Sequence, residues 1–555
     1  MMQCEKELHN SCTDDASDKI SDQSSENQET LNLCDDDHDD LMKIMGNIVQ
    51  DSNCPPRIMQ LLLDQQRNLK ESKTGRRWSK EIIRLCLTMW CRSPRAYGDL
   101  RSSGFLLLPS HRLLQIYKNK IHQKAGINKE ILHWMKNEAV NKNIPPEGYE
   151  GGLMLDEMSI QSDLQFYSRD NKIYITGFTD LGDESALVES IKTKTSNMKL
   201  ATHVLQYVFL GFSGFRFPIC HFPTIQASAS DLYILTWEVI NMLQVFGFTV
   251  RYISTDGAQT NRDFARILLG DFKSETVSTM KIPNIYCPTN PPIVFIMDYS
   301  HVVKKIRNNI LKSTSSSNGK RRLFVNGHYI LWRHFYDAYL WDTSHNPLPV
   351  HHKLTIEHFE LTSETKMRNK LAEDVLGKEM LHLMQCYGNT LQNPSHLQST
   401  IQLLQNTSQL IDIFRDHRPI IDTSDERLAT LKKILDWFKN WEEEVNSDDS
   451  LKQKDTFLIS HQTRSDICSL IIGFRELCID KLRSSATTIV PCRINSDVIE
   501  NVFSQQRGLY NGNNTNPNFL TYCRTMNAII IGQPSISRKS NTGGGSTGAN
   551  PFNTY

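Results

Sequence analysis

The stretch FTVRYISTDGAQTNRDFARILLG, residues 248–270, decides the fold class. Its apolar first part ends at Asp256, Gly257 makes a turn, and a helix-like pattern of apolar residues follows. Residues 290–310, NPPIVFIMDYSHVVKKIRNNI, repeat this order of strand, acid and helix, with Asp298 at the strand end. The sequence therefore predicts an α/β fold in which strands alternate with helices.

Upstream of this stretch the sequence favours strands in succession. Residues 151–160, GGLMLDEMSI, form a short apolar run that contains Asp156, and residues 172–181 and 203–212 read as two further strands. Residues 229–247 then have the apolar spacing of a helix. Successive strands followed by alternating helix and strand indicate a mixed α/β sheet.

Three acidic residues stand where a metal site would need them. Asp156 and Asp256 each end an apolar strand, and Glu500 lies on a predicted helix. In an RNase H-like sheet the first two project from adjacent central strands and the third from a helix packed over them, so that two Mg²⁺ or Mn²⁺ ions about 3.5–4 Å apart can be clamped. Carboxylates are ligands that Mg²⁺ prefers, and they repel one another without a cation. The alternative is that they serve as ordinary caps or surface charges.

Residues 73–135 are expected to form a compact helical module. Ser79 suits the N-cap of a first helix, and Ser93 and Ser110 stand at the starts of a second and a third. Three short helices with a basic last one are typical of a helix-turn-helix DNA-binding module, although a small helical bundle has the same pattern. Four basic residues would contact phosphates or face solvent: Arg112, Lys118, Lys120 and Lys124.

Bulk properties narrow the class of protein. The chain has 555 residues, enough for three or four domains, and its 62 basic and 62 acidic residues balance. That balance argues against a purely electrostatic nucleic-acid binder but permits local basic patches. No apolar run approaches the roughly 20 residues of a membrane span, and the first residues lack a secretory signal, so we expect no membrane partner. The 13 cysteines have no disulfide or zinc spacing and suit reduced thiols.

The remaining segments differ in composition. Residues 1–42 are polar and acidic, which predicts a disordered tail, and residues 43–72 have the apolar spacing of possible dimerising helices. Residues 301–425 are mostly helical in pattern, residues 426–535 hold further helices, and residues 536–555 have the composition of a flexible tail.

Four short motifs occur in an order that resembles the P element-type DNA transposases and their animal relatives: LMLDEM, STDGAQTNR, MDYSHVVKKIRNN and DVIENVFSQQRG. Residues 76–110 resemble the helix-turn-helix of that family, with a basic-aromatic-Ser start and an S-P-x-A-Y turn. Residues 514–531 resemble its closing helix. The resemblance extends from about residue 76 to about residue 535, and the four motifs are specific together although none is specific alone.

The resemblance implies a split catalytic domain. An RNase H-like fold would have its first part over residues 150–300 and its second over residues 426–535, with a mainly helical GTP-binding insertion domain over residues 301–425. The catalytic and metal-binding roles of the family would fall on three positions: Asp156, Asp256 and Glu500. The activity so implied is cut-and-paste transposition, in which metal-dependent hydrolysis of DNA precedes strand transfer.

The resemblance also implies GTP as a cofactor in assembling the protein on DNA. Asp298, Lys304 and Asp497 are the nucleotide contacts that it suggests, since a lysine can pair with phosphate and an aspartate can accept from a guanine edge. The sequence contains no Walker A motif that would indicate a P-loop. For Asp298 and Lys304 the alternative is an ordinary ion pair at a helix start.

One departure from the family leaves rival interpretations open. Family members usually begin with a THAP zinc finger that reads the DNA ends, and an acidic segment stands in its place. The first expectation is an active nuclear transposase, acting on DNA as a homodimer or larger homo-oligomer. The second is a domesticated, non-catalytic DNA-binding or interaction protein that keeps the fold. A third is a GTP-dependent assembly module without nuclease function.

Overall fold

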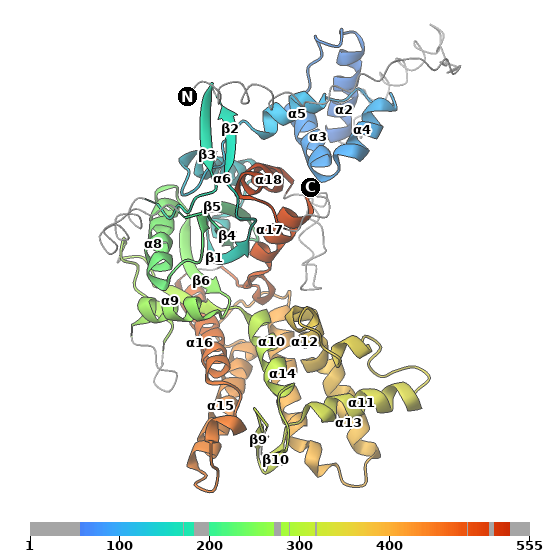
Figure 1. The fold of residues 1–555 in the computed structure, drawn as a ribbon, viewed down its shortest axis with the longest axis vertical. Coiled ribbons are helices and arrows are strands. Elements are labelled where there is room, and N and C mark those ends of the chain that lie inside the picture. The colour runs from blue at the N-terminus through green and yellow to red at the C-terminus, as the bar shows by residue number, and fades with distance from the viewer. Residues whose placement is uncertain are drawn as a thin grey trace, which may run out of the picture. The chain divides into compact units, whose positions relative to one another are not determined.

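The computed structural model describes residues 56–169, 171–182, 199–270, 279–287, 289–316, 319–484, 487–509 and 516–532 (Figure 1). The chain divides into two compact units, one up to Ile82 and the other from Ile83 onward. The predicted tails, residues 1–42 and 536–555, lie outside the described residues, as does the first part of the predicted dimerising segment.

The described part of the first unit is organised around helix α2 (Pro56–Leu69). Asp64 of this helix is buried and accepts a hydrogen bond from the backbone N–H of Ser79 at 2.7 Å. Asn68 exchanges two hydrogen bonds with the backbone of Arg77. These contacts fix the segment that leads into the next helix, α3 (Lys80–Arg92).

Helices α4 (Pro94–Ser102) and α5 (His111–Lys118) begin where the sequence predicts. The Ser93 hydroxyl accepts from the backbone N–H of Ala96, and the Ser110 hydroxyl accepts from that of Leu113. The buried Tyr97 donates its hydroxyl to the Pro109 carbonyl, so α4 is tied to the residues that precede α5.

The central sheet has six strands in the order β5-β4-β1-β6-β8-β7. Their bounds are β1 (Glu150–Ser159), β4 (His203–Gly211), β5 (Arg216–Thr224), β6 (Thr249–Thr255), β7 (Lys281–Ile282) and β8 (Ile293–Met297). The β5-β4-β1 half is antiparallel, whereas β1, β6 and β8 run parallel to their neighbours. The predicted mixed α/β sheet is confirmed.

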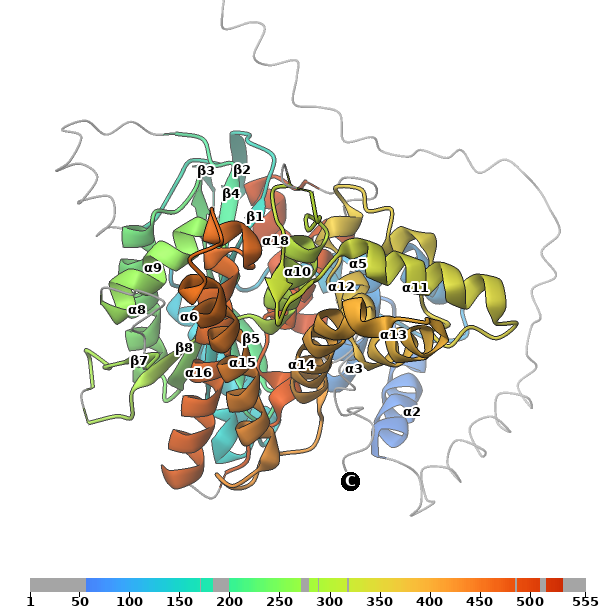
Figure 2. The same ribbon diagram turned by 90° about the horizontal axis from the view of Figure 1, so that it is seen from below.

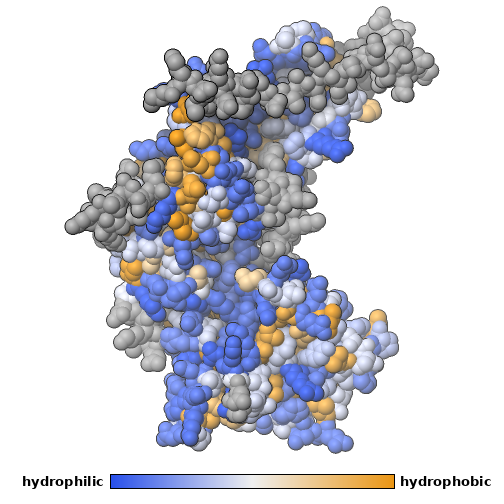
Figure 3. Space-filling view, in the orientation of Figure 1, coloured by the Kyte–Doolittle hydropathy of each residue, from blue (hydrophilic) through white to orange (hydrophobic). Residues whose placement is uncertain are grey.

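One predicted strand lies outside this sheet. Within residues 172–181 the structure has β3 (Lys172–Thr176), which pairs with β2 (Gln165–Arg169) in a separate hairpin. The hairpin leaves Phe166, Ile173 and Ile175 largely exposed, and apolar side chains gather over it in Figure 3. Strand β5, which completes the sheet beside β4, was not predicted from the sequence.

Helices cover both faces of the sheet. They are α6 (Lys129–Asn141), α8 (Ala229–Val245), α9 (Gln259–Leu269), α10 (Tyr299–Ile310), α16 (His461–Ser484), α17 (Asp497–Gly508) and α18 (Phe519–Gly532). None of the described helices combines the length and apolar character needed to cross a bilayer.

Neighbouring residues of β4 show which helix covers which face. Tyr207 lies 3.2 Å from the Thr236 hydroxyl of α8, whereas Gln206 accepts a hydrogen bond from Tyr522 of α18. Successive side chains of a strand point to opposite faces, so α8 and α18 cover opposite sides, as Figures 1 and 2 also show. Asp156 is paired with Gln206 and therefore projects toward the α18 side.

Helix α16 packs directly against β8. A Cβ atom at Gly473 would lie 2.3 Å from the carbonyl oxygen of Phe295, so only glycine permits this approach. Helix α17 packs against β1 and β4. The elements that follow the long middle segment of the chain thus return to the sheet on which Asp156 and Asp256 lie.

The segment between α10 and α16 is mainly helical. It contains α11 (Trp332–His345), α12 (Asn369–Leu376), α13 (Lys378–Thr390), α14 (Gln398–Arg415), α15 (Glu426–Ser447) and a small hairpin of β9 (Phe324–Val325) and β10 (His328–Tyr329). Helix α15 packs against both α14 and α16.

Candidate active site

Asp156 and Asp256 stand in register on adjacent strands. Strands β1 and β6 are parallel, and Met154 pairs with Ser254. Two residues further along each strand, on the same face, come Asp156 and Asp256. Strand β6 ends at Thr255, so the second acid lies at the start of the following loop. The sheet therefore brings together two of the three predicted metal ligands.

The Asp256 side chain is held by the start of α9. Its Oδ1 accepts hydrogen bonds from the backbone N–H of Ala258 at 2.9 Å and from the side-chain amide of Asn261 at 2.6 Å. Both partners donate, which favours the charged carboxylate as acceptor. The S-T-D-G-A-Q-T-N sequence supplies both donors within five residues of the acid.

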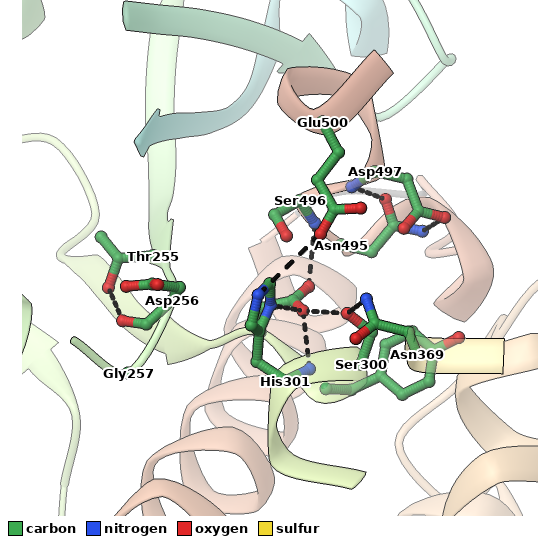
Figure 4. A network of polar contacts seen from close by, with 12 residues as sticks. Thr255, Asp256, Gly257, Ser300, His301, Asn369, Asn495, Ser496, Asp497 and Glu500 are labelled. Carbon is green, nitrogen blue, oxygen red and sulfur yellow. Dashed lines mark hydrogen bonds and ion pairs between the residues drawn. The ribbon is translucent and has the colours of Figure 1, made fainter. Parts of the chain in front are cut away.

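Glu500 is carried to this region by the first turn of α17. Its Oε1 lies 3.9 Å from Nε2 of His301, on α10. Figure 4 shows Glu500 reaching from α17 toward His301, with Asp256 at the end of its strand. Burial raises the pKa of Glu500, with a further contribution from Asp298, while His301 and Lys304 oppose the shift.

The three predicted metal ligands influence one another electrostatically. Burial raises the pKa of Asp156 to about 7, and the charge of Asp256 raises it further, followed by a smaller contribution from Glu500. His301 opposes the shift. Across the described residues, no group of three His, Cys, Asp or Glu side chains is close enough to hold a metal ion. The acids thus share one neighbourhood without forming a closed coordination cage.

Asp298 joins the ends of three elements. It caps α10, where its Oδ2 accepts from the backbone N–H of His301, from the His301 ring at 2.9 Å and from the Ser300 hydroxyl. Its Oδ1 accepts from the backbone N–H of Ser496, the residue before α17. Burial alone would raise the pKa of Asp298, but the His301 and Ser300 contacts hold it well below its usual range.

These contacts bear on the predicted nucleotide role of Asp298. Both of its carboxylate oxygens already accept hydrogen bonds from the protein. A guanine base would therefore compete with the capping of α10 and with the anchoring of α17. The nucleotide contact stays a prediction, and the structure adds an anchoring role that the sequence did not indicate.

His301 is a residue of the site that the sequence reasoning missed. Its ring contacts Asp298 through Nδ1 and faces Glu500 through Nε2. Burial tends to lower its pKa, but the hydrogen bond and charge of Asp298 outweigh this, so the pKa is raised. The spacing in D-Y-S-H is the available signal, because the third residue after an N-cap aspartate lies beside its carboxylate.

Lys304, one helical turn after His301, is also directed toward the acids. Burial lowers its pKa, while the charges of Glu500, Asp298 and Asp256 act in the opposite direction. Its ammonium group is thus surrounded by the carboxylates of the site. This places a predicted nucleotide contact beside the predicted catalytic acids.

Asp497, three residues before Glu500, has an unused acceptor. Its Oδ2 lies 3.3 Å from the Asn495 amide, whereas its buried Oδ1 has no hydrogen-bond partner within the described part of the chain. Burial raises the pKa of Asp497 to about 7, Asp298 and Glu500 raise it further, and Arg415 opposes them. An orphaned buried oxygen of this kind is unfavourable unless a donor reaches it.

Comparisons with known proteins were made for the whole chain. Residues 123–269 match the family model of the TNP-like RNase H N-terminal domain, a segment that includes both Asp156 and Asp256. The solved structure of a Drosophila P element transposase strand transfer complex is similar, with a TM-score of 0.65 and 18% sequence identity, over 90% of this chain and 99% of that chain. The search of curated proteins finds no match.

The class of protein follows from these findings. The chain contains a TNP-like RNase H domain, which carries the two strand-end acids. Over most of its length the chain has the fold of the Drosophila P element transposase. The resemblance to the P element-type transposases that the motifs predicted is thereby confirmed.

Proposed function

We propose that this protein is a DNA transposase of the P element type, which hydrolyses phosphodiester bonds and transfers DNA strands in a metal-dependent reaction. The proposal rests on one observation above all: Asp156 and Asp256 follow the paired residues Met154 and Ser254 on adjacent parallel strands. The family match covers this same segment, and the similar structure is titled as a strand transfer complex.

The chemistry of the acids fits a pair of divalent ions. Asp156, Asp256 and Glu500 would hold Mg²⁺ or Mn²⁺, which prefer carboxylate oxygens. The raised pKa values of Asp156 and Glu500 support this assignment, because they reflect buried negative charge that a cation would neutralise. When bound, such ions activate an attacking hydroxyl and stabilise the leaving oxygen.

The chain's own residues would orient these acids and the DNA. Asn261 holds Asp256 in one rotamer by its 2.6 Å hydrogen bond. Asp298 fixes the His301 ring, which in turn faces Glu500. Lys304 adds a cation beside the acids, where a DNA phosphate would lie. The helical module of α3, α4 and α5 would contribute further DNA contacts.

We further assign GTP as an assembly cofactor, bound where the helical insertion meets α17. Of the three predicted contacts, Asp497 is the best supported, because its free buried Oδ1 would accept from the N–H groups of a guanine edge. Lys304 would pair with phosphate, and Asp298 would contribute after exchanging a protein hydrogen bond. Action on chromosomal DNA implies a nuclear protein, and joining two DNA ends implies at least a homodimer.

The test compares cleavage and joining of oligonucleotide DNA by wild type and Asp256→Ala in Mg²⁺ or Mn²⁺. The matched control is Asp263→Ala, an aspartate on α9 whose pair with Arg266 is exposed. We expect Asp256→Ala to be inactive and the control to retain activity. Equal cleavage by wild type and Asp256→Ala would dismiss the catalytic proposal, and DNA binding without cleavage by wild type would favour the domesticated alternative.

The nucleotide assignment is tested by titrating labelled GTP against wild type, Lys304→Ala and Asp497→Asn. Both variants should bind GTP more weakly, Asp497→Asn because an amide presents only one acceptor to the guanine edge. Unchanged affinity would remove that residue from the site, and absence of binding by wild type would remove the cofactor.

A further inference from the structure

A buried carboxylate outside the acidic site holds two cations. Asp466, on α16, is only 1% exposed. It accepts two hydrogen bonds from Arg262 of α9, at 3.1 and 2.8 Å, and one from the Lys305 ammonium of α10 at 3.0 Å. Two-point pairing between arginine and carboxylate fixes geometry as well as charge. Three helices that surround the end of β6 are therefore joined at one point.

The same lysine reaches the loop of Asp256. Lys305 also donates to the carbonyl of Gly257, the next residue along the chain, at 2.8 Å. A Cβ atom at Gly257 would lie 1.7 Å from the Lys305 nitrogen and 2.7 Å from an Asp466 oxygen. The loop thus lies directly against the ion pair, and glycine is needed for this approach. We name the four residues Asp466, Arg262, Lys305 and Gly257 the loop clamp.

The loop clamp lies where the helical insertion is connected to the sheet. Lys305 is on α10, which leads into the insertion, and Asp466 is on α16, which leaves it. A second contact joins these helices, because Asn309 accepts from the backbone N–H of Ser460 and donates to Thr463. A displacement of α16 relative to α10 would therefore act on the backbone next to Asp256.

We infer that Asp466 is a positioning residue for Asp256, and that the loop clamp transmits the state of the helical insertion to this carboxylate. The role in catalysis rests on the proposed function, whereas the effect on the loop does not. Side chains that orient a metal ligand from outside the site commonly change metal affinity or activity about 10- to 100-fold when replaced. A buried charge pair contributes little to stability on balance, which makes geometry its more important effect.

The experiment uses the full-length chain in four forms: wild type, Asp466→Asn, Asp466→Glu and the control Asp263→Asn. Hydrogen exchange is followed in the peptide that covers residues 255–262. Asp466→Asn should exchange faster there by about ten-fold, because at least one charge-assisted hydrogen bond is lost. Asp466→Glu should recover part of the protection, and Asp263→Asn should behave as wild type.

A second variant isolates the contact with the loop. Lys305→Met removes the hydrogen bond to Gly257 but leaves the pair between Asp466 and Arg262 intact. It should also accelerate exchange over residues 255–262, and it decides the matter should Asp466→Asn fail to fold. Wild-type exchange in this peptide, or acceleration spread evenly over β1 and β8, would overturn the inference.

The catalytic arm separates this inference from the proposed function. If wild type cleaves DNA, Asp466→Asn should lower kcat by at least about ten-fold while KM for DNA stays unchanged. A rise in KM with unchanged kcat would overturn the positioning role. If wild type is inactive, the proposed function fails, and the exchange data alone decide whether Asp466 orders the loop.

Discussion

Asp298 accepts a hydrogen bond of 2.9 Å from the backbone N–H of Ser496, a residue 198 positions later in the chain. The first residue ends a central strand and the second precedes the helix of Glu500. Everything between them includes the helical insertion. One buried carboxylate therefore closes the RNase H-like domain across that insertion and determines where the third acid lies.

We predict that Asp298→Asn lowers the free energy of unfolding by about 2 kcal/mol at pH 7, the usual cost of losing hydrogen bonds to a buried charge. Because the folded-state pKa of Asp298 is depressed, its contribution is present above the ordinary value of 3.8 and is lost as the pH falls below it. Urea unfolding at several pH values measures this. A difference between wild type and variant that grows on acidification contradicts the prediction.

The contact between α16 and β8 gives a second prediction. Gly473→Ala places a Cβ atom 2.3 Å from the Phe295 carbonyl oxygen, so the helix must shift. We expect a loss of about 1–3 kcal/mol, as for other overpacked positions. Gly508→Ala, at the end of α17 with no neighbour within 4 Å, is the control. Thermal unfolding of both variants decides, and equal midpoints would show that α16 tolerates the shift.

Local sequence patterns predicted the strands and their acids well. Asp156 and Asp256 each follow an apolar run, and parallel strands bring such positions to one place. The roles of Asp298 and Asp466 depend on partners far along the chain, Ser496 and Arg262 respectively. A single sequence contains no signal for such pairing, because the periodicity of an element does not show what packs against it.

The same limit explains the misplaced strand. Residues 172–176 have the alternation of a half-buried strand, yet β3 pairs only with β2 and exposes most of its side chains. Alternation predicts strand conformation but not which sheet the strand joins. The hairpin interrupts the chain between β1 and β4, which are neighbours in the central sheet.

Asn261 provides a prediction about the orientation of the second acid. Asn261→Ala removes the 2.6 Å hydrogen bond to Asp256 while the Ala258 backbone contact remains. The carboxylate gains rotameric freedom, and we expect DNA cleavage to fall by about 10-fold or more. Gln259→Ala is the matched control, since its side chain contacts only the exposed Asp263. Unchanged cleavage by Asn261→Ala would show that the backbone N–H alone orients the acid.

The last prediction concerns metal binding without DNA. Burial and mutual repulsion raise the pKa of Asp156 to about 7, so the empty site carries unfavourable charge at neutral pH. Mn²⁺ that binds only the folded state should raise the unfolding free energy by about 2.7 kcal/mol at a concentration 100 times its Kd. Asp156→Asn should lose most of this gain while becoming more stable than wild type without metal, because the repulsion is relieved. Thermal unfolding with and without Mn²⁺ measures both effects, with Asp263→Asn as the control. An equal shift in wild type and Asp156→Asn would place the bound ion elsewhere on the chain.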